Sequence, residues 1–322
     1  MNMRSRSVLA VVGFVALLLI VFSADIVLAA DQVMPAAAQS SMPWWGWPLI
    51  LFVVTFFLGI AAVLGGVGGG VLFVPIIGGF FPFHIDFVRG AGLLVALAGA
   101  LAAGPGLLKK GMADLRLALP VALIASSCAI VGAMIGLAMP AKVVNIALGG
   151  TILGIVAIML MAKKSEFPDV QKPDNLSTAL RISGVYYEPS LGENINWQIH
   201  RTPQGLATFI IIGVMAGMFG LGAGWANVPV LNLMMGAPLK VSVATSKFLL
   251  SITDTSAAWI YVNNGAVLPM MVVPSIIGIM LGSLVGVRIL AKTKPTAIRY
   301  MVIGLLSFAG LRALLKGLEI WN

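Results

Sequence analysis

The sequence predicts an all-α polytopic membrane protein, built from two homologous repeats in inverted orientation, each with a glycine-rich broken helix. Three observations lead to this fold class: the composition, a glycine motif that recurs at a constant spacing, and the positions of the basic turns. The 322 residues are 60% hydrophobic and only 10% charged, whereas soluble domains carry about 25% charged residues. A chain with so little charge and such long apolar runs has lipid as its solvent.

The duplication is visible in the run Gly-Gly-Val-Gly-Gly-Gly at residues 65–70, which is followed by Pro75. Five positions recur after a constant offset (220 − 66 = 154): Gly66, Gly68, Gly70, Val74 and Pro75 match Gly220, Gly222, Gly224, Val228 and Pro229. The same gap-free offset pairs Gly59 with Gly213, Gly111 with Gly265, Pro120 with Pro274, Gly132 with Gly286 and Gly150 with Gly304. We therefore predict two membrane repeats, residues 46–161 and 205–316, joined by a polar connection at 162–204.

Residues 1–30 have two interpretations that the sequence leaves open. Arg4 and Arg6 precede the apolar run 8–22, and residues 27–29 (Val-Leu-Ala) could end in a signal-peptidase site. The run 8–30 is equally long enough to remain as a signal-anchor helix. Both interpretations place residues 31–45 on the outer side of the membrane, so the rest of the topology is the same.

Apolar runs predict the helices of both repeats, because about 20 helical residues are needed to span a bilayer. Trp44, Trp45 and Trp47 suit an aromatic belt at the membrane interface. In the first repeat, the run 49–64 leads into the glycine break, the run 71–83 is too short to span, and full-length runs follow at 87–108, 115–139 and 143–161. The second repeat has matching runs at 205–221, 225–235 (short), 241–262, 267–291 and 298–315.

Basic residues predict the orientation, because Lys and Arg accumulate in cytoplasmic turns. They flank three turns: Lys109, Lys110 and Arg116; Lys163, Lys164 and Arg201; Lys292, Lys294 and Arg299. If each short element crosses the membrane, each repeat has five crossings, the repeats are inverted, and all three basic turns lie inside with Arg4 and Arg6. If the short elements are re-entrant, each repeat has four spans and one basic turn falls outside. The charge bias favours the inverted repeat.

The connection at 162–204 predicts a small cytoplasmic β-hairpin. It begins charged and is broken by Pro168 and Pro173. Residues 179–187 then alternate in the manner of a strand, and residues 195–200 suit a return strand. The segment is too short to be an independent catalytic domain.

The glycine breaks have two interpretations. The small-xxx-small spacing lets membrane helices pack closely. Alternatively, unwound backbone at membrane depth lines a cavity, and paired broken helices mark the substrate site of duplicated transporters, where half-helix N-termini present amides to an anion. On this second interpretation the substrate-binding candidates are Gly66, Gly68, Gly69, Gly70, Gly220, Gly222 and Gly224. Asn227, in the second short element, either joins this site or caps a helix.

The most polar membrane segment is residues 241–254. Lys247, Ser251 and Asp254 are spaced i, i+4, i+7 and share one helix face, and a charge in a bilayer suggests function by default. We expect Thr245, Ser246 and Lys247 to contact substrate, with snorkelling as the alternative for Lys247, and Asp254 to couple transport to protons. The first repeat has Leu93 and Ala100 at the two charged positions, so this site is asymmetric.

Other residues offer little chemistry of their own. We interpret His84, Asp86 and Arg89 as interface residues that end a span. His84 and His200 lack metal-ligand spacing, and neither a GxSxG elbow nor a P-loop is present. Despite a net charge of +9, no basic patch with interleaved aromatics exists. We therefore expect no catalytic residue, no metal, no cofactor and no nucleic acid, and transport driven by a gradient.

Residues 65–75, their partner 220–229, and residues 244–246 (Ala-Thr-Ser) resemble the sulfite exporter (TauE/SafE) family of membrane permeases over about residues 46–316. The resemblance implies an inner-membrane secondary transporter for a small sulfur-containing anion, such as sulfite or an organosulfonate. Many members carry a Thr-Ser-like pair in both repeats, whereas the first repeat here has Ala91 and Gly92. The alternatives are a permease on the same scaffold for another small ion or carboxylate, and a membrane-integral enzyme or assembly factor. Direction, coupling ion and oligomeric state stay open.

Overall fold

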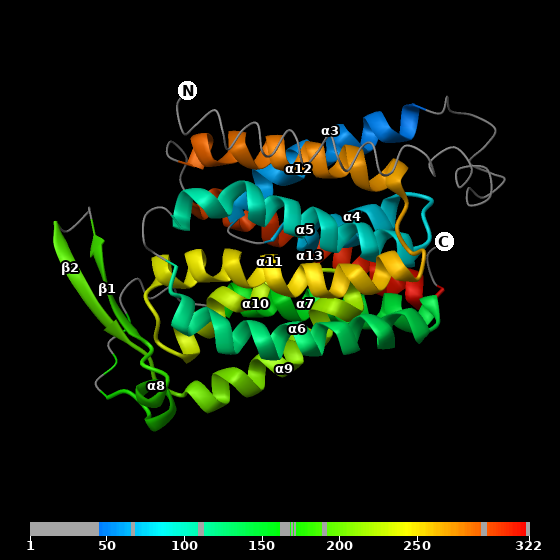
Figure 1. The fold of residues 1–322 in the computed structure, drawn as a ribbon. Coiled ribbons are helices and arrows are strands. Elements are labelled where there is room, and N and C mark those ends of the chain that lie inside the picture. The colour runs from blue at the N-terminus through cyan, green and yellow to red at the C-terminus, as the bar shows by residue number, and fades with distance from the viewer. Residues whose placement is uncertain are drawn as a thin grey trace.

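The computed structural model describes residues 45–65, 68–108, 113–161, 168, 170, 172–188, 192–290 and 295–319. The predicted signal segment at 1–30, Gly66 and most residues of the three basic turns lie outside these ranges. Long helices lie side by side with a roughly common direction, and a β-hairpin projects from one end of the bundle (Figure 1). The architecture is thus helical with one small sheet, as the sequence predicts.

Helices form where the apolar runs predict them. The first repeat contains α3 (Gly46–Gly65), α4 (Gly69–Phe80), α5 (Ile85–Leu108), α6 (Leu115–Ala138) and α7 (Ala141–Met161). The second contains α9 (Thr202–Phe219), α10 (Gly224–Pro229), the π-helix η1 (Val230–Met234), α11 (Leu239–Asn263), α12 (Pro269–Leu290) and α13 (Pro295–Gly317). Six of the described helices are long and apolar enough to cross a membrane: α3, α5, α6, α7, α9 and α12. The 25-residue α11 and the 23-residue α13 are long enough but more polar.

Each repeat packs mainly against the other. Helix α3 packs on α12, and its repeat counterpart α9 packs on α6; α5 packs on its own counterpart α11, and α7 on α13. The counterparts lie antiparallel. Arg89, near the start of α5, lies beside Tyr261, near the end of α11, and Gly317, at the end of α13, faces Lys142, at the start of α7. Antiparallel packing of equivalent spanning helices is the arrangement that an inverted duplication requires.

Both short elements fold back along the helix that precedes them. Trp47, at the start of α3, contacts Phe81 and Phe83, just after α4, with ring centroids 5.9 and 5.6 Å apart. In the second repeat the His200 backbone N–H, just before α9, donates to the Met235 carbonyl, just after η1 (3.0 Å). Because the chain returns to the face where it began, α5, α6 and α7 supply the net crossings of the first repeat. An odd number of net crossings suits inverted repeats, and the choice between five and four crossings per repeat stays a prediction.

The side of the membrane on which each end lies stays a prediction, and it has a direct test. Single cysteines at Lys110 and at the exposed Asn264, each in a Cys128→Ala background, are expected to face opposite sides. A membrane-impermeant thiol reagent added to whole cells should label only Asn264→Cys, because positive-inside bias places Lys110 in the cytoplasm. Permeabilised cells serve as the control, in which both positions should be labelled. Equal labelling of intact cells at both positions would contradict the inverted topology.

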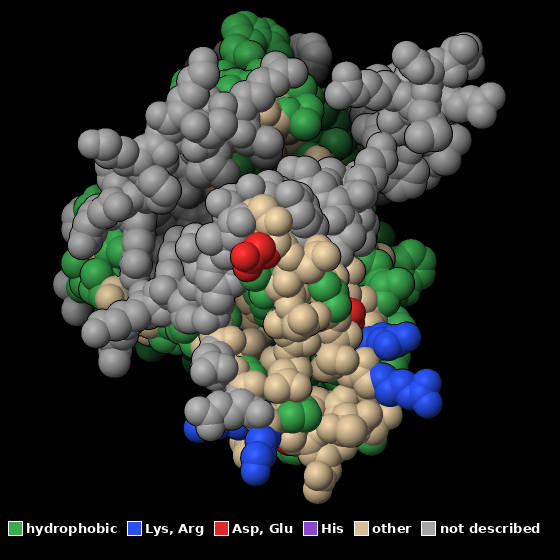
Figure 2. Space-filling view, turned by 90° about the vertical axis from the view of Figure 1, so that its left-hand side faces the viewer, with side chains coloured by type: hydrophobic (Ala, Val, Ile, Leu, Met, Phe, Trp, Pro, Cys, Tyr) green, Lys and Arg blue, Asp and Glu red, His purple; other side chains and the backbone are tan. Residues whose placement is uncertain are grey.

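The polar connection forms a short helix and the predicted hairpin. Helix α8 (Asn175–Ala179) precedes β1 (Ser183–Glu188) and β2 (Glu193–Gln198), which pair antiparallel. The first strand therefore starts later than the predicted 179, because residues 175–179 are helical. Figure 2 shows this end of the molecule, with the visible Lys and Arg side chains at the right and lower left of its lower half.

The connection is anchored to the bundle. Trp197 is buried in a cluster of apolar side chains that includes Met235 and Val241. The Asp174 carboxylate accepts hydrogen bonds from the Ser177 and Thr202 backbone N–H groups (3.1 and 3.0 Å). Burial tends to raise the pKa of Asp174, but these hydrogen bonds outweigh burial and hold its pKa below the ordinary value. The hairpin is thus held against the entry to α9.

Candidate functional site

The two glycine breaks meet inside the bundle. A Cβ placed on Gly224 would lie 3.1 Å from the Cα of Gly68, and one on Gly70 would lie 2.6 Å from the Leu221 carbonyl oxygen. The start of α4 thus lies against the second break, a contact that only residues without side chains allow. Gly69 differs, because a Cβ on it would lie against the side chains of Ile279 and Val95. The lack of a side chain at Gly69 therefore serves helix packing, whereas the role of its backbone N–H at the substrate stays a prediction.

The second break turns on two glycines in left-handed backbone conformation. Gly220 has φ = 68° and ends α9, and Gly222 has φ = 69°. Residues with a Cβ rarely adopt such angles. The space is closed as well: a Cβ on Gly220 would lie 2.5 Å from the Cα of Arg89, and one on Gly222 would lie 2.8 Å from Oδ2 of Asp254. This backbone is therefore specific to glycine for two independent reasons.

Asp254 faces this break from α11 and is fully buried. Neither of its carboxylate oxygens has a hydrogen-bond partner of normal geometry among the described residues. The polar groups that act on it are the Ala223 backbone N–H and the more distant Lys247 ammonium. A buried carboxylate without a partner is costly. Such a group points to a proton, an ion or water that completes the site.

Lys247 lies on the same face of α11 as Asp254 and keeps part of its surface accessible. No hydrogen bond or ion pair joins it to another described residue. Seven residues of α-helix separate it from Asp254, a rise of about 10 Å. The two charges therefore act on each other through space without pairing, which leaves the ammonium available to a ligand.

Further buried polar atoms without a partner lie on α10 and α11. Asn227, in α10, is 1% exposed, and both atoms of its side-chain amide lack a partner among the described residues; the same holds for the Thr253 hydroxyl and the Trp225 indole N–H. Helix α10, which carries Asn227 and Trp225, packs on α11. Native proteins leave few buried polar groups unsatisfied. Asn227 therefore stays a predicted member of the substrate site.

The other predicted hydroxyls lie further along α11. Thr245 is buried, and its hydroxyl accepts a hydrogen bond from the Asp114 backbone N–H (3.3 Å), just before α6. Asp114 in turn caps α6 by accepting from the Leu117 N–H (2.7 Å). Ser246 is also buried. Thr245 therefore holds the start of α6, a role the sequence reasoning did not predict.

Arg89 is the residue whose place the sequence reasoning missed. It is 0% exposed, whereas the sequence suggested an interface residue. Its Nη1 donates to the Met218 carbonyl in the last turn of α9 (2.8 Å), and its Nη2 pairs with Asp86. Tyr261 lies beside it and donates to the Gly217 carbonyl (2.9 Å). The signal was present: an arginine between apolar residues of a membrane span suggests function by default.

The described residues contain no group of three or more His, Cys, Asp or Glu side chains able to hold a metal ion. The polar groups of the candidate site are suited to binding: they are backbone amides, one ammonium, one unpaired carboxylate and one free side-chain amide. Of these groups, the Asp254 carboxylate lies against the second break at Gly222, and Lys247 lies about two helical turns away on the same face of α11. Such a site can hold a small polar ligand and exchange a proton.

Comparison with known proteins agrees with this picture. A family described as "Sulfite exporter TauE/SafE" matches residues 51–313. The "Probable membrane transporter protein YunE" of Bacillus subtilis (strain 168) is 22% identical over 277 residues, which cover 84% of this chain and 98% of the relative. No solved structure matches the chain.

Proposed function

We propose, since this chain belongs to the sulfite exporter TauE/SafE family of membrane transporters, that it moves a small sulfur-containing anion, such as sulfite or an organosulfonate, as a secondary transporter. It is a multi-pass membrane protein, and an inner-membrane placement fits its bacterial relative. One observation carries the choice of substrate class. The start of α4 meets the second glycine break on the face of α11 that carries Lys247 and Asp254.

The meeting of the breaks suits an oxyanion. The first N–H groups of α4, around Gly69 and Gly70, have no intrahelical acceptor, and the helix dipole adds positive potential there. Lys247 supplies a full positive charge, and the Asn227 amide can donate to a substrate oxygen. A tetrahedral sulfur oxyanion offers several acceptor oxygens, so it can satisfy donors from more than one element.

Asp254 supplies the coupling in this proposal. A carboxylate without a partner is stable in the apolar site when it is protonated, and it repels an anion when it is ionised. Proton uptake and anion occupancy therefore favour each other. The proposal thus describes proton-coupled transport, with no enzymatic step.

A permease for a small carboxylate on the same scaffold is the second candidate, because the same donors suit a carboxylate. Purified protein in proteoliposomes separates the candidates by uptake of sulfite, methanesulfonate and acetate under an imposed pH gradient. We expect saturable accumulation of sulfite or methanesulfonate, and weaker accumulation of acetate. Preference for acetate would favour the second candidate, and uptake of none would contradict both. Consumption of an anion without any gradient would indicate an enzyme instead.

Lys247→Gln is expected to weaken substrate binding about tenfold, because it removes one charge at roughly 10 Å or less in a site of low dielectric. The control is Lys142→Gln, which removes an exposed lysine that pairs with Glu319 on the surface (3.1 Å). That change should leave binding unaltered. Substrate dissociation constants of the purified variants, with chromatographic profiles as a check on folding, provide the measurement. Unchanged binding in Lys247→Gln would show that the lysine only snorkels.

A further inference from the structure

The carbonyl end of α9 lies at the second break and is covered by residues from two other helices. Arg89, from α5 of the first repeat, donates to the Met218 carbonyl, and Tyr261, from α11, donates to the Gly217 carbonyl. The same arginine contacts the turn itself, because Gly220 packs on its backbone. Two residues further on, Gly222 faces Asp254. The covered carbonyls and the candidate site are thus parts of one turn.

The end of a helix carries about half a negative charge on its free carbonyls. At the second break this charge lies beside the place proposed for an anion, which it repels. It also attracts cations, since exposed carbonyls of broken membrane helices coordinate them. The Arg89 guanidinium is fully buried, so solvent screens it little. It therefore opposes the negative potential that the end of α9 creates, and the paired Asp86 carboxylate offsets part of this effect.

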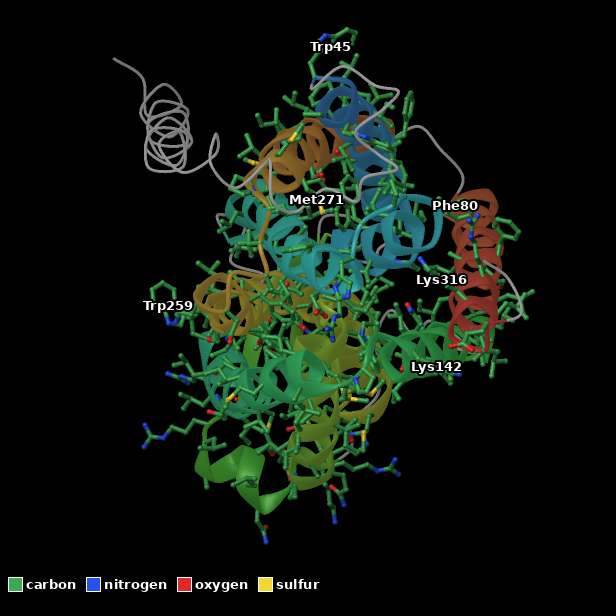
Figure 3. The ribbon with its side chains drawn as sticks, turned by 90° about the vertical axis from the view of Figure 1, so that its right-hand side faces the viewer. Trp45, Phe80, Lys142, Trp259, Met271 and Lys316 are labelled. Atoms are coloured by element: carbon green, nitrogen blue, oxygen red, sulfur yellow. The ribbon has the colours of Figure 1, made fainter. Side chains whose placement is uncertain are left out.

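A basic side chain also covers a free carbonyl at the end of α4. Lys316, from α13, donates to the Gly78 carbonyl in the last turn of α4 (2.9 Å), and it lies on the side of α13 that faces α4 (Figure 3). That end of α4 is remote from the breaks. Arg89 also lacks a repeat counterpart, because the offset places Val243 there (243 − 89 = 154). Among the described residues, only Arg89 both covers the carbonyl end of a helix and contacts a glycine break.

We infer that Arg89 is a positioning residue for charge selectivity: it covers the carbonyl end of α9 and makes the second break accept anions in preference to cations. This inference rests on the proposed function and adds a determinant to it. Arg89 acts through α9 and need not touch the substrate. Each repeat therefore supplies one basic side chain that favours an anion at the break, Arg89 from the first and Lys247 from the second.

The test uses the dependence on ligand charge, which loss of structure does not reproduce. Purified full-length protein is titrated with methanesulfonate, a monoanion, and with sulfite at mildly alkaline pH, where it is a dianion. A fixed charge at roughly 10 Å with an effective dielectric constant near 20 changes the Kd about tenfold per unit of ligand charge. Arg89→Gln should therefore weaken the binding of methanesulfonate about tenfold and the binding of sulfite about a hundredfold. Arg89→Lys should restore most of the binding of both.

Two further variants complete the experiment. Asp86→Asn removes the acid that pairs with Arg89. It should therefore tighten the binding of both ligands, and the binding of sulfite more than that of methanesulfonate. Lys316→Gln should change neither affinity. Equal losses for both ligands in Arg89→Gln, or no loss, would overturn the inference. If Arg89→Gln does not fold, Asp86→Asn provides the test. Equal tightening of the binding of both ligands, or no tightening, would then overturn the inference.

The outcome also separates this inference from the proposed function. A wild-type protein that binds neither anion removes the proposed function, and the inference falls with it. A wild-type protein that binds both anions, with an Arg89→Gln variant that keeps the same ratio of affinities, overturns the inference alone.

Discussion

Replacing Gly222 with leucine is expected to lower transport by at least a hundredfold while the protein remains folded in the membrane. The backbone at this position has φ = 69°, which costs a residue with a Cβ about 1–2 kcal/mol. The added Cβ would also lie 2.8 Å from Oδ2 of Asp254. The side chain thus fills the space beside the carboxylate, where we place the substrate. Gly68→Leu is expected to have a similar effect, since the leucine reaches toward Gly224 from an unstrained backbone.

The matched control is Gly150→Leu. Gly150 lies within α7, and a Cβ there meets nothing within 4 Å, so the same substitution should leave transport nearly unchanged. Sulfite uptake into proteoliposomes measures activity, and size-exclusion chromatography in detergent measures folding. Loss of folded protein in both break variants would support a packing role alone. Normal uptake by folded Gly222→Leu protein would remove the glycine break from the site.

Asp254→Asn is expected to abolish the accumulation of substrate driven by a pH gradient and to preserve substrate binding. Asparagine keeps the shape of the protonated carboxyl group but cannot release a proton. Because neither carboxylate oxygen has a hydrogen-bond partner of normal geometry among the described residues, the change removes no such bond and should not lower the thermal stability. The coupling role therefore predicts loss of function without loss of stability.

Binding and accumulation are measured on the same proteoliposome preparation. Glu193→Gln, on the exposed part of β2, removes a carboxylate remote from the breaks and should behave as wild type. A structural role for Asp254 predicts a lower melting temperature together with weaker binding. Normal accumulation by Asp254→Asn under a pH gradient would end the coupling hypothesis.

Local features of the chain were readable without coordinates. The membrane environment followed from composition, and the broken helices from glycine followed by Pro75 and Pro229. The two repeats stay a prediction from one constant offset. The hairpin followed from alternation, although its first strand begins at Ser183 because residues 175–179 form a helix. These features depend on short stretches of sequence and on spacing, which a single chain displays in full.

Contacts between the repeats could not be read in this way, because helix packing brings together residues that no periodicity links. The offset paired Gly68 with Gly222, whereas the structure places Gly68 against Gly224. Thr245 accepts a hydrogen bond from the start of α6, a contact that no spacing indicated, and its predicted place at the substrate stays a prediction. Arg89, expected at the interface, is buried against the end of α9, which lies 129 positions along the chain. Whether a polar side chain is buried, paired or left without a partner depends on its neighbours in space, and helices from both repeats supply those neighbours.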